Sequence, residues 1–289
     1  MKLNFGPLIV QLSGVTDREI PTNACLFRAP DDREAEASYT FHFVDRLPMP
    51  GDDWQMVFRR HDIVVFRKGE LEARLLAVGN LNACYALYRE RNEREADVYF
   101  IGALRSELRT DTLFVSCLCL ERPLSLKGCY ILHCAFLDYR GQAVLFSGPS
   151  GIGKSTHADL WCRTIEGTKV INGDRALICP DGEGGYEVCG WPVCGSSGIC
   201  LNERRRLSAI VFMEQAADNE IRQMTAMQHF KSLCSQVTVN YWNPVLTREA
   251  LDRLLVLAGK TCVRTYACNM KPEAAAVLHR HLTEAGAIR

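Results

Sequence analysis

The sequence of 289 residues lacks a net charge of either sign. Lys and Arg together number 34, and Asp and Glu together also number 34. A protein of balanced charge has no overall field that would recruit nucleic acid or an acidic membrane surface. We therefore expect neither nucleic acid nor a membrane as a partner.

Long apolar runs are also missing. Runs such as 209–213 are far shorter than the roughly 20 residues that a membrane-spanning helix needs. Residues 1–14 hold one Lys and a brief apolar stretch, but no small-residue cleavage site follows. The segment therefore does not have the pattern of a signal peptide. These features predict a cytoplasmic protein.

The chain has 14 cysteines but no Cys-x-x-Cys pair. Structural zinc sites typically use two such pairs, or Cys with His at set spacing. A disulfide framework is typical of small secreted chains, and these cysteines fall inside expected strands and helices. We expect them to be buried free thiols that pack as small apolar side chains.

Residues 1–127 have the pattern of short strands separated by turns. Tyr39, Phe41 and Phe43 alternate with polar residues, as in a half-buried strand, and Lys68-Gly69-Glu70 is typical of a hairpin turn. No catalytic motif is present in this region. The pattern predicts an accessory, mainly antiparallel β-domain. Its strands are expected at 39–43, 54–58, 63–67, 71–78, 84–88 and 98–101.

Residues 128–289 alternate strands with helices, which predicts an α/β domain. Apolar spacing of three and four residues indicates one helix behind Thr225 and another between Thr247 and Gly259. Pro272 is expected to begin the last helix. Strands are expected at 130–139, 143–147, 169–171, 207–213 and 263–267.

A glycine-rich segment in this second region fits G-x-x-x-x-G-K-[ST] at every fixed position. An apolar strand at 143–147 precedes it, and an amphipathic helix through Trp161 follows, which is the context that the phosphate-binding P-loop requires. The segment and the next residue are Gly148, Pro149, Ser150, Gly151, Ile152, Gly153, Lys154, Ser155 and Thr156.

The residue types of this segment suit the phosphates of ATP. Glycines let successive backbone N–H groups point inward at phosphate oxygens, and the helix N-terminus adds unpaired donors. Lys154 is expected to reach the β- and γ-phosphates, and the hydroxyl of Ser155 to hold Mg²⁺. The guanine-specifying Asn-Lys-x-Asp pattern is absent, which argues against a small GTPase.

Two acidic residues are candidates to complete the metal site. Asp174 follows the expected strand at 169–171, and Glu214 ends the strand at 207–213. An acid at such a position binds Mg²⁺ or activates a nucleophile. A solvated carboxylate at a strand end is the structural alternative for each of them.

Further segments on both sides of the P-loop resemble one family. They are Leu132-His133-Cys134-Ala135-Phe136-Leu137-Asp138 and Asn172-Gly173-Asp174-Arg175. Together with the P-loop they are similar to the HPr kinase/phosphorylase superfamily, the P-loop kinases related to PEP carboxykinase. Segments 190–195 and 198–203 look like a bacterial branch described as PEP-carboxykinase-like or HPr-kinase-related. The resemblance implies a P-loop HPr kinase/PEP carboxykinase-like fold for residues 128–289.

The resemblance also implies site residues. Asp174 matches the catalytic Asp of the family, His133 matches the His on the strand beside it, and Lys154 matches the phosphate-binding Lys. The metal ligands would be Ser155, Asp174 and Glu203, since Gly173 stands where the family has the first Asp of a pair. Arg175, or one of Arg204, Arg205 and Arg206, would neutralise developing charge. A core histidine and a solvated basic turn are the structural alternatives for His133 and the arginine triplet.

The expected function is an ATP-dependent kinase with ATP and Mg²⁺ as cofactors. Its acceptor would be a hydroxyl, on a serine of a peptide or protein or on a small metabolite, and a homo-oligomer stays open. The family's Pro-Gly-Arg-Asn loop is not found, which argues against a reverse phosphorylase reaction. Two alternatives remain: a non-catalytic ATP-binding regulatory module, and a PEP-carboxykinase-like phosphotransferase or ATPase.

Overall fold

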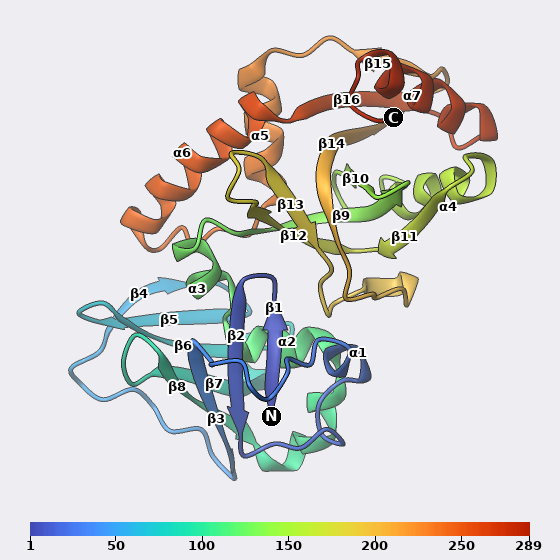
Figure 1. Ribbon diagram of the computed structural model, residues 1–289. Helices are drawn as coiled ribbons and strands as arrows, with labels where there is room; N and C mark the ends of the chain where they lie inside the picture. Colours follow the sequence, from blue (N-terminus) through green and yellow to red (C-terminus); the bar gives the residue numbers. More distant parts are fainter. The chain divides into compact units, whose positions relative to one another are not determined.

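A computed structural model describes residues 1–289 (Figure 1). The chain divides into two compact units, Met1–Pro123 and Leu124–Arg289, whereas the sequence pattern placed the change between residues 127 and 128. Both units combine helices with β-sheets, so the protein is of the α/β kind with mixed and antiparallel sheets.

The first unit is built on an eight-stranded sheet in the order β1-β2-β3-β8-β7-β6-β5-β4. Five of its neighbouring pairs are antiparallel, but β2 with β3 and β3 with β8 run parallel. The sheet is therefore mixed, with most of its neighbouring pairs antiparallel. Its strands are β1 (Lys2–Phe5), β2 (Leu8–Ser13), β3 (Ala37–Val44), β4 (Gln55–Arg59), β5 (Ile63–Lys68), β6 (Leu71–Ala77), β7 (Cys84–Glu90) and β8 (Glu95–Ile101).

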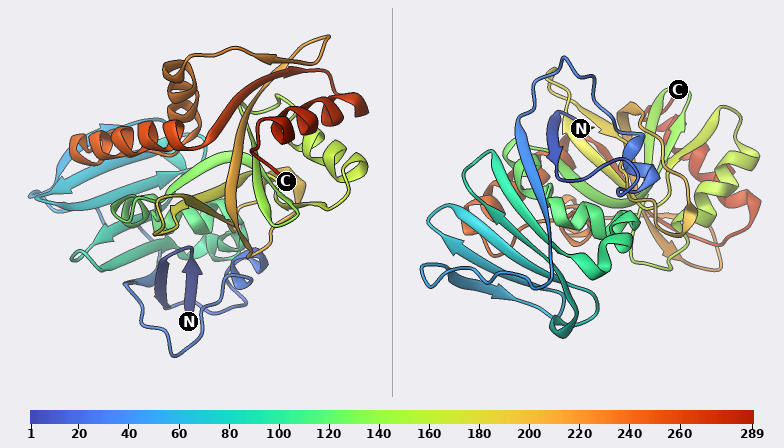
Figure 2. Two further views of the ribbon diagram at one scale, coloured as in Figure 1. Left: turned by 45° about the horizontal axis from the view of Figure 1, so that its top comes forward. Right: turned by 90° about the horizontal axis from the view of Figure 1, so that it is seen from below.

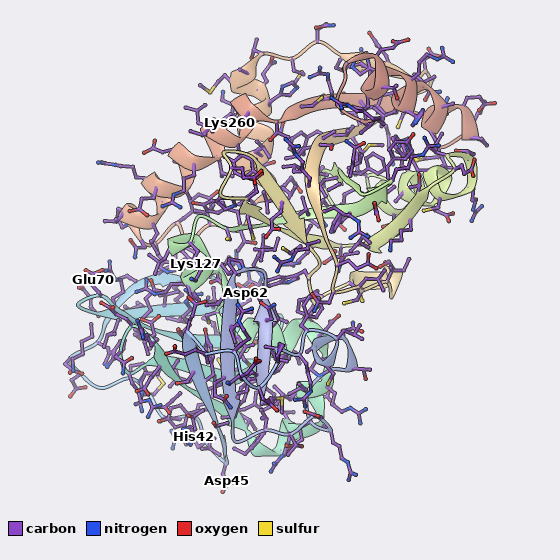
Figure 3. All side chains as sticks on the ribbon, in the orientation of Figure 1. His42, Asp45, Asp62, Glu70, Lys127 and Lys260 are labelled. Atoms are coloured by element: carbon purple, nitrogen blue, oxygen red, sulfur yellow. The ribbon has the colours of Figure 1, made fainter.

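The hairpin expected at Lys68-Gly69-Glu70 joins β5 to β6. Gly69 has φ +60°, a left-handed conformation that costs glycine little, and Glu70 lies at the turn (Figure 3). The sequence pattern did not reveal the short helices of this unit. They are α1 (Thr22–Cys25), the 3₁₀ helices η1 (Leu81–Ala83) and η2 (Gly102–Arg109), α2 (Asp111–Leu118), and α3 (Glu121–Leu126), which ends in the second unit.

A network of buried charges ties β6 and β7 to the start of α3. Glu72 and Arg74 are at most 2% exposed and form an ion pair, and Arg122 joins them through Glu72 at 2.9 Å and Glu90 at 2.8 Å. Arg74 also pairs with Glu121. Because each buried charge has an oppositely charged partner, the cost of removing these groups from water is partly offset.

The second unit is built on another eight-stranded sheet, with the path β10-β9-β12-β13-β14-β16-β15. β10 pairs with β14 as well as with β9, so five of the strands form a closed circuit, and β11 is added beside β9. Its strands are β9 (Tyr130–Tyr139), β10 (Gln142–Ser147), β11 (Thr168–Asn172), β12 (Arg175–Pro180), β13 (Tyr186–Cys189), β14 (Arg204–Gln215), β15 (Glu220–Arg222) and β16 (Cys262–Cys268).

Helices cover both faces of this sheet (Figures 1 and 2). Leu132, Cys134 and Phe136 of β9 face a cluster that includes the apolar sides of α5 (Ala226–Gln236) and α6 (Pro244–Lys260). Their neighbours Ala135 and Leu137 face a second cluster with α4 (Lys154–Thr164) and α7 (Pro272–Glu284). The alternation explains why β9 reads as a continuous apolar run, since both of its faces are buried.

Helix boundaries follow capping chemistry. Thr225 caps α5 as expected: its side chain and that of Gln228 form a reciprocal capping box. The expected start of α6 at Thr247 is wrong, because Asn243 accepts a hydrogen bond from the N–H of Leu246 and Pro244 begins the helix. The helix also continues through Gly259 to Lys260.

The structure also describes the state of the cysteines, the grouping of possible metal ligands and the length of the apolar helices. All 14 thiols are free, and most are buried, although Cys162 is exposed. No group of three or more Cys, His, Asp or Glu side chains is arranged to hold a metal ion. No helix is both long and apolar enough to cross a membrane.

Candidate functional site

The glycine-rich loop leaves the end of β10 and enters α4, the strand–loop–helix order that its sequence predicts. Gly148, Gly151 and Gly153 have φ of +144°, +79° and +107°, conformations that other residues rarely adopt. A side chain at Gly153 would also collide with Met270. The positive φ angles of the loop backbone therefore require these glycines.

Backbone donors are concentrated where the loop becomes the helix. The N–H groups of Gly153, Lys154, Ser155 and Thr156 donate no hydrogen bond within the structure, while that of His157 bonds to the carbonyl of Gly153. Such a set of free donors at a helix N-terminus favours an anion. The donor set fits a phosphate group, and the hydroxyl of the exposed Ser155 suits a hard cation such as Mg²⁺.

Lys154 lies folded against this loop. Its ammonium donates to the carbonyls of Gly148 at 2.9 Å and Pro149 at 3.0 Å, and the side chain is 6% exposed. Burial lowers the pKa of Lys154, and the nearby carboxylate of Asp174 acts in the opposite direction. The lysine and Asp174, 20 positions apart in the sequence, are therefore close enough to interact electrostatically.

A buried asparagine shapes the segment that carries Asp174. The side-chain oxygen of Asn172 accepts from the N–H groups of Asp174 at 2.8 Å and Arg175 at 2.9 Å. Its amide nitrogen donates to the carbonyls of Trp191 and Val193. Asn172 is fully buried, so this turn is fixed from both sides. Sequence reasoning missed the role of Asn172, although Asn before Gly is a turn signal.

Strand β9 lies between the loop and Asp174. On one side Cys134 pairs with Ser147, the last residue before the loop, and on the other His133 pairs with Arg175. The N–H of Cys134 also donates to the carbonyl of Asp174 at 2.9 Å. Adjacent strands thus bring His133, Asp174 and the glycine-rich loop to one end of the sheet.

The histidine side chain is near Asp174 but not hydrogen-bonded to it. His133 Nε2 is 3.7 Å from Asp174 Oδ1, beyond hydrogen-bond range, and Nδ1 is 3.2 Å from Gln236 Oε1. Burial lowers the pKa of His133, and the charge of Lys154 lowers it further. We therefore expect a neutral imidazole at pH 7.

Helix α4 also approaches the Asp174 segment directly. Ser155 Oγ lies 3.4 Å from the carbonyl oxygen of Gly173. The guanidinium of Arg175 contacts the carboxylate of Asp174 at 3.2 Å, and both side chains are partly exposed. Ser155, His133 and Asp174 therefore lie partly accessible to solvent near the buried Lys154.

The absence of a carboxylate at position 173 has a steric cause. A side chain at Gly173 would collide with Ser197, in the 3₁₀ helix η3 (Gly195–Ser197). The hydroxyl of Ser197 donates to the carbonyl of Cys194 at 2.7 Å, which holds it there. Ser197 belongs to no sequence motif, so its contact with Gly173 could not be predicted from the sequence.

Glu203 is not brought together with Ser155 and Asp174. Its carboxylate is bound by the ammonium of Lys169 at 2.8 Å and by Arg205. The hydrogen bond from Lys169 lowers the pKa of Glu203, and Arg205 acts in the same direction. Lys169 lies three residues before Asn172, about 10 Å along β11. Glu203 is thus an ion-pair partner of basic residues rather than a carboxylate of this site.

The acid at the end of β14 lies near the loop. β14 runs parallel to β10, so its carboxyl end reaches the same edge of the sheet as the loop. Gln215 there lies 3.5 Å from the carbonyls of Gly151 and Ile152, and Glu214 is half exposed with Arg222 3.9 Å away. Gln215 is a neighbour of the loop that sequence reasoning did not identify.

These features define an α/β protein whose second unit has a glycine-rich turn with free backbone N–H groups beside a partly exposed aspartate. The chain belongs to the family described as SynChlorMet cassette protein ScmC, whose family model matches residues 105–271. The match includes the glycine-rich loop, Asp174 and η3. No curated protein matches the chain.

Proposed function

We propose that the second unit is a Mg²⁺- and ATP-dependent kinase that phosphorylates a hydroxyl group. One observation carries the proposal: the free N–H groups at the start of α4 lie beside Asp174, linked by the 3.4 Å approach of Ser155 to Gly173. A phosphate site alone would serve binding, whereas a carboxylate beside it supplies a base. The fold we propose is that of the HPr kinase/PEP carboxykinase-like P-loop proteins.

ATP is the substrate that supplies the γ-phosphoryl group. Residues Gly148–Thr156 would hold its phosphates, with Ser155 and Asp174 as ligands of the accompanying Mg²⁺. Lys154 would exchange its bonds to the loop carbonyls for phosphate oxygens.

Asp174 would act on the acceptor. Its carboxylate takes the proton of the acceptor hydroxyl as that oxygen bonds to the γ-phosphorus, and the bond to the β-phosphate oxygen breaks to release ADP. Arg175, which contacts Asp174 at 3.2 Å, would balance the negative charge. His133 would be a positioning residue, since Lys154 and burial favour its neutral form.

The acceptor hydroxyl is that of a peptide or protein serine, or of a small metabolite. The Cys194–Cys200 segment borders Asp174, because Gly195 is closely packed against its side chain. We propose that this segment contributes to acceptor selection. We also propose a cytoplasmic location, where the reaction has access to ATP.

The test follows transfer of label from γ-labelled ATP to a cell extract in the presence of Mg²⁺. Wild type should label an acceptor, and Asp174→Asn should bind nucleotide but transfer at least 100-fold more slowly, as expected for loss of a general base. Glu203→Gln is the control, and it should retain transfer because Glu203 pairs with Lys169 instead.

Three results would contradict the proposal. Nucleotide binding without transfer by any variant would favour the non-catalytic regulatory module. Equal transfer by wild type and Asp174→Asn would remove the base from the mechanism. Retained ATP binding in Lys154→Ala would show that the nucleotide is bound elsewhere.

A further inference from the structure

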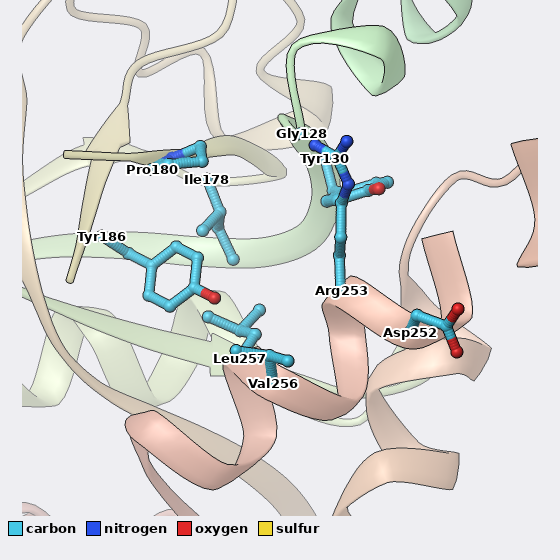
Figure 4. Close-up of a pocket in the computed structure, with 9 residues that line it drawn as sticks. All are labelled: Gly128, Tyr130, Ile178, Pro180, Tyr186, Asp252, Arg253, Val256 and Leu257. Carbon is cyan, nitrogen blue, oxygen red and sulfur yellow. The ribbon is translucent and has the colours of Figure 1, made fainter. Parts of the chain in front are cut away.

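The second unit contains a cavity of about 350 Å³ away from the glycine-rich loop. It lies between the first residues of β9, the β12–β13 hairpin and one side of α6 (Figure 4). Tyr130 at this cavity is at the opposite end of the β9–β12 pairing from His133. The volume is at the small end of the range for ligand pockets.

The walls of the cavity are mainly apolar. Ile178, Val256 and Leu257 line it together with Pro180 and the ring of Tyr186. Val256 is 48% exposed, so the cavity opens to the surface beside α6. Such walls suit a small hydrocarbon or aromatic body, because burying it removes apolar surface from water.

Arg253 supplies a positive charge at this cavity. Its side chain makes no ion pair or hydrogen bond in the structure, and the residue is exposed, which places it at the mouth. The absence of a side chain at Gly128, with φ +72°, leaves room for the guanidinium. The neighbouring Asp252 forms no ion pair with Arg253, and in Figure 4 its carboxylate lies on the far side of Arg253 from Tyr186.

Two tyrosine hydroxyls lie near the same guanidinium. The hydroxyl of Tyr130 is buried without a hydrogen-bond partner, which is rare for a buried polar atom. Burial raises the pKa of Tyr130 to about 12, and the charge of Arg253 acts against this rise. Arg253 affects Tyr186 in the same way. Arg253 and Tyr130 therefore lie together at one side of an apolar cavity, and Tyr186 lies across from them (Figure 4).

We propose that this cavity binds a small apolar monocarboxylate. The carboxylate would accept hydrogen bonds from Arg253 and from the hydroxyl of Tyr130, while the apolar body lies against Ile178 and Leu257. Guanidinium and carboxylate match in charge and planar geometry, and the ligand would give the Tyr130 hydroxyl its missing partner. The site is separate from the proposed kinase site and does not depend on it.

The test measures binding of 4-phenylbutyrate to the full chain by titration calorimetry, with 4-phenylbutyramide as the uncharged match. The carboxylate should bind at least about tenfold more tightly than the amide, because it gains charge-assisted hydrogen bonds. Arg253→Met should abolish this difference while leaving weak binding of both compounds.

Two further variants separate the ligand site from general effects. Tyr130→Phe should weaken binding of the carboxylate about threefold to tenfold without loss of fold, since it removes only an unpaired hydroxyl. Asp252→Asn is the control, because it removes a charge next to Arg253 on the side away from Tyr186. This variant should not weaken binding of the carboxylate.

Specific results would overturn the proposal. They are equal binding of the acid and the amide, full binding by Arg253→Met, or no saturable binding of either compound at millimolar concentration. Competition by ATP would also contradict it, because the two sites would then be one.

Discussion

The side chain of Ser197 occupies the space that a side chain at Gly173 would need. The two residues are 24 positions apart, and η3 brings them together beside Asp174. The packing of Ser197 against Gly173 therefore leaves room in this turn for the carboxylate of Asp174 alone. A second carboxylate at position 173 would require Ser197 to move.

This packing predicts a coupled pair of substitutions. Gly173→Asp should lower the free energy of unfolding by about 1–3 kcal/mol, as expected for overpacking. Adding Ser197→Gly, which removes the colliding atoms, should restore part of that loss. Denaturant unfolding of the two single variants and the double variant measures the coupling. Additive effects would mean that the two side chains do not compete for the same space.

Because His157 is buried, we expect the folded protein to lose stability in acid. It is fully buried in α4, accepts a hydrogen bond from Trp161, and burial lowers its pKa to about 4. Because the unfolded state binds this proton at a pKa near 6.5, stability is present above that value and falls as pH drops toward 4. The contribution is about 3 kcal/mol.

The measurement is the free energy of unfolding at pH 7 and pH 4.5 for wild type and His157→Gln. Gln keeps an acceptor for Trp161 but does not titrate. Wild type should lose more stability than the variant over this interval. Parallel curves would mean that His157 does not contribute to acid sensitivity.

The buried charges of the first unit predict a large cost for removing one member. Arg74→Met should lower the free energy of unfolding by about 3–5 kcal/mol, because Glu72 and Glu121 lose a partner. Arg91→Met removes an arginine whose ion pairs with Glu95 and Asp97 are long, at 3.9 and 3.7 Å, and should cost no more than about 1 kcal/mol. Similar losses in both variants would argue against a special role for the network.

Much of the second unit could be predicted because its signals are local. The strand before the glycine-rich loop, the loop and α4 follow from an apolar run, glycines and helical spacing, and the ends of β9 agree with the expected 130–139. The hairpin at Gly69 is equally local. Each of these elements depends on residues that are close together in the sequence.

The parts that could not be predicted depend on distant contacts. Lys169 determines the environment of Glu203, although 34 positions separate them. The parallel pairing of β3 with β8 joins strands more than 50 residues apart, and antiparallel and parallel strands have similar short-range patterns. Asn243 and Thr247 are both good caps, and only the packed structure distinguishes them.

Because the hydroxyl of Tyr130 has no partner, we expect that removing it will stabilise the folded protein. Its oxygen is buried and has no partner, so Tyr130→Phe removes an unsatisfied polar atom and leaves the ring in place. Without ligand, the free energy of unfolding should rise by about 0.5–1 kcal/mol. Tyr186→Phe is the matched control, because that residue is only partly buried, and it should change stability little. Thermal or denaturant unfolding in ligand-free buffer measures both. A loss of stability in Tyr130→Phe would mean that the hydroxyl already has a partner, such as an ordered water, and would remove it from the proposed carboxylate site.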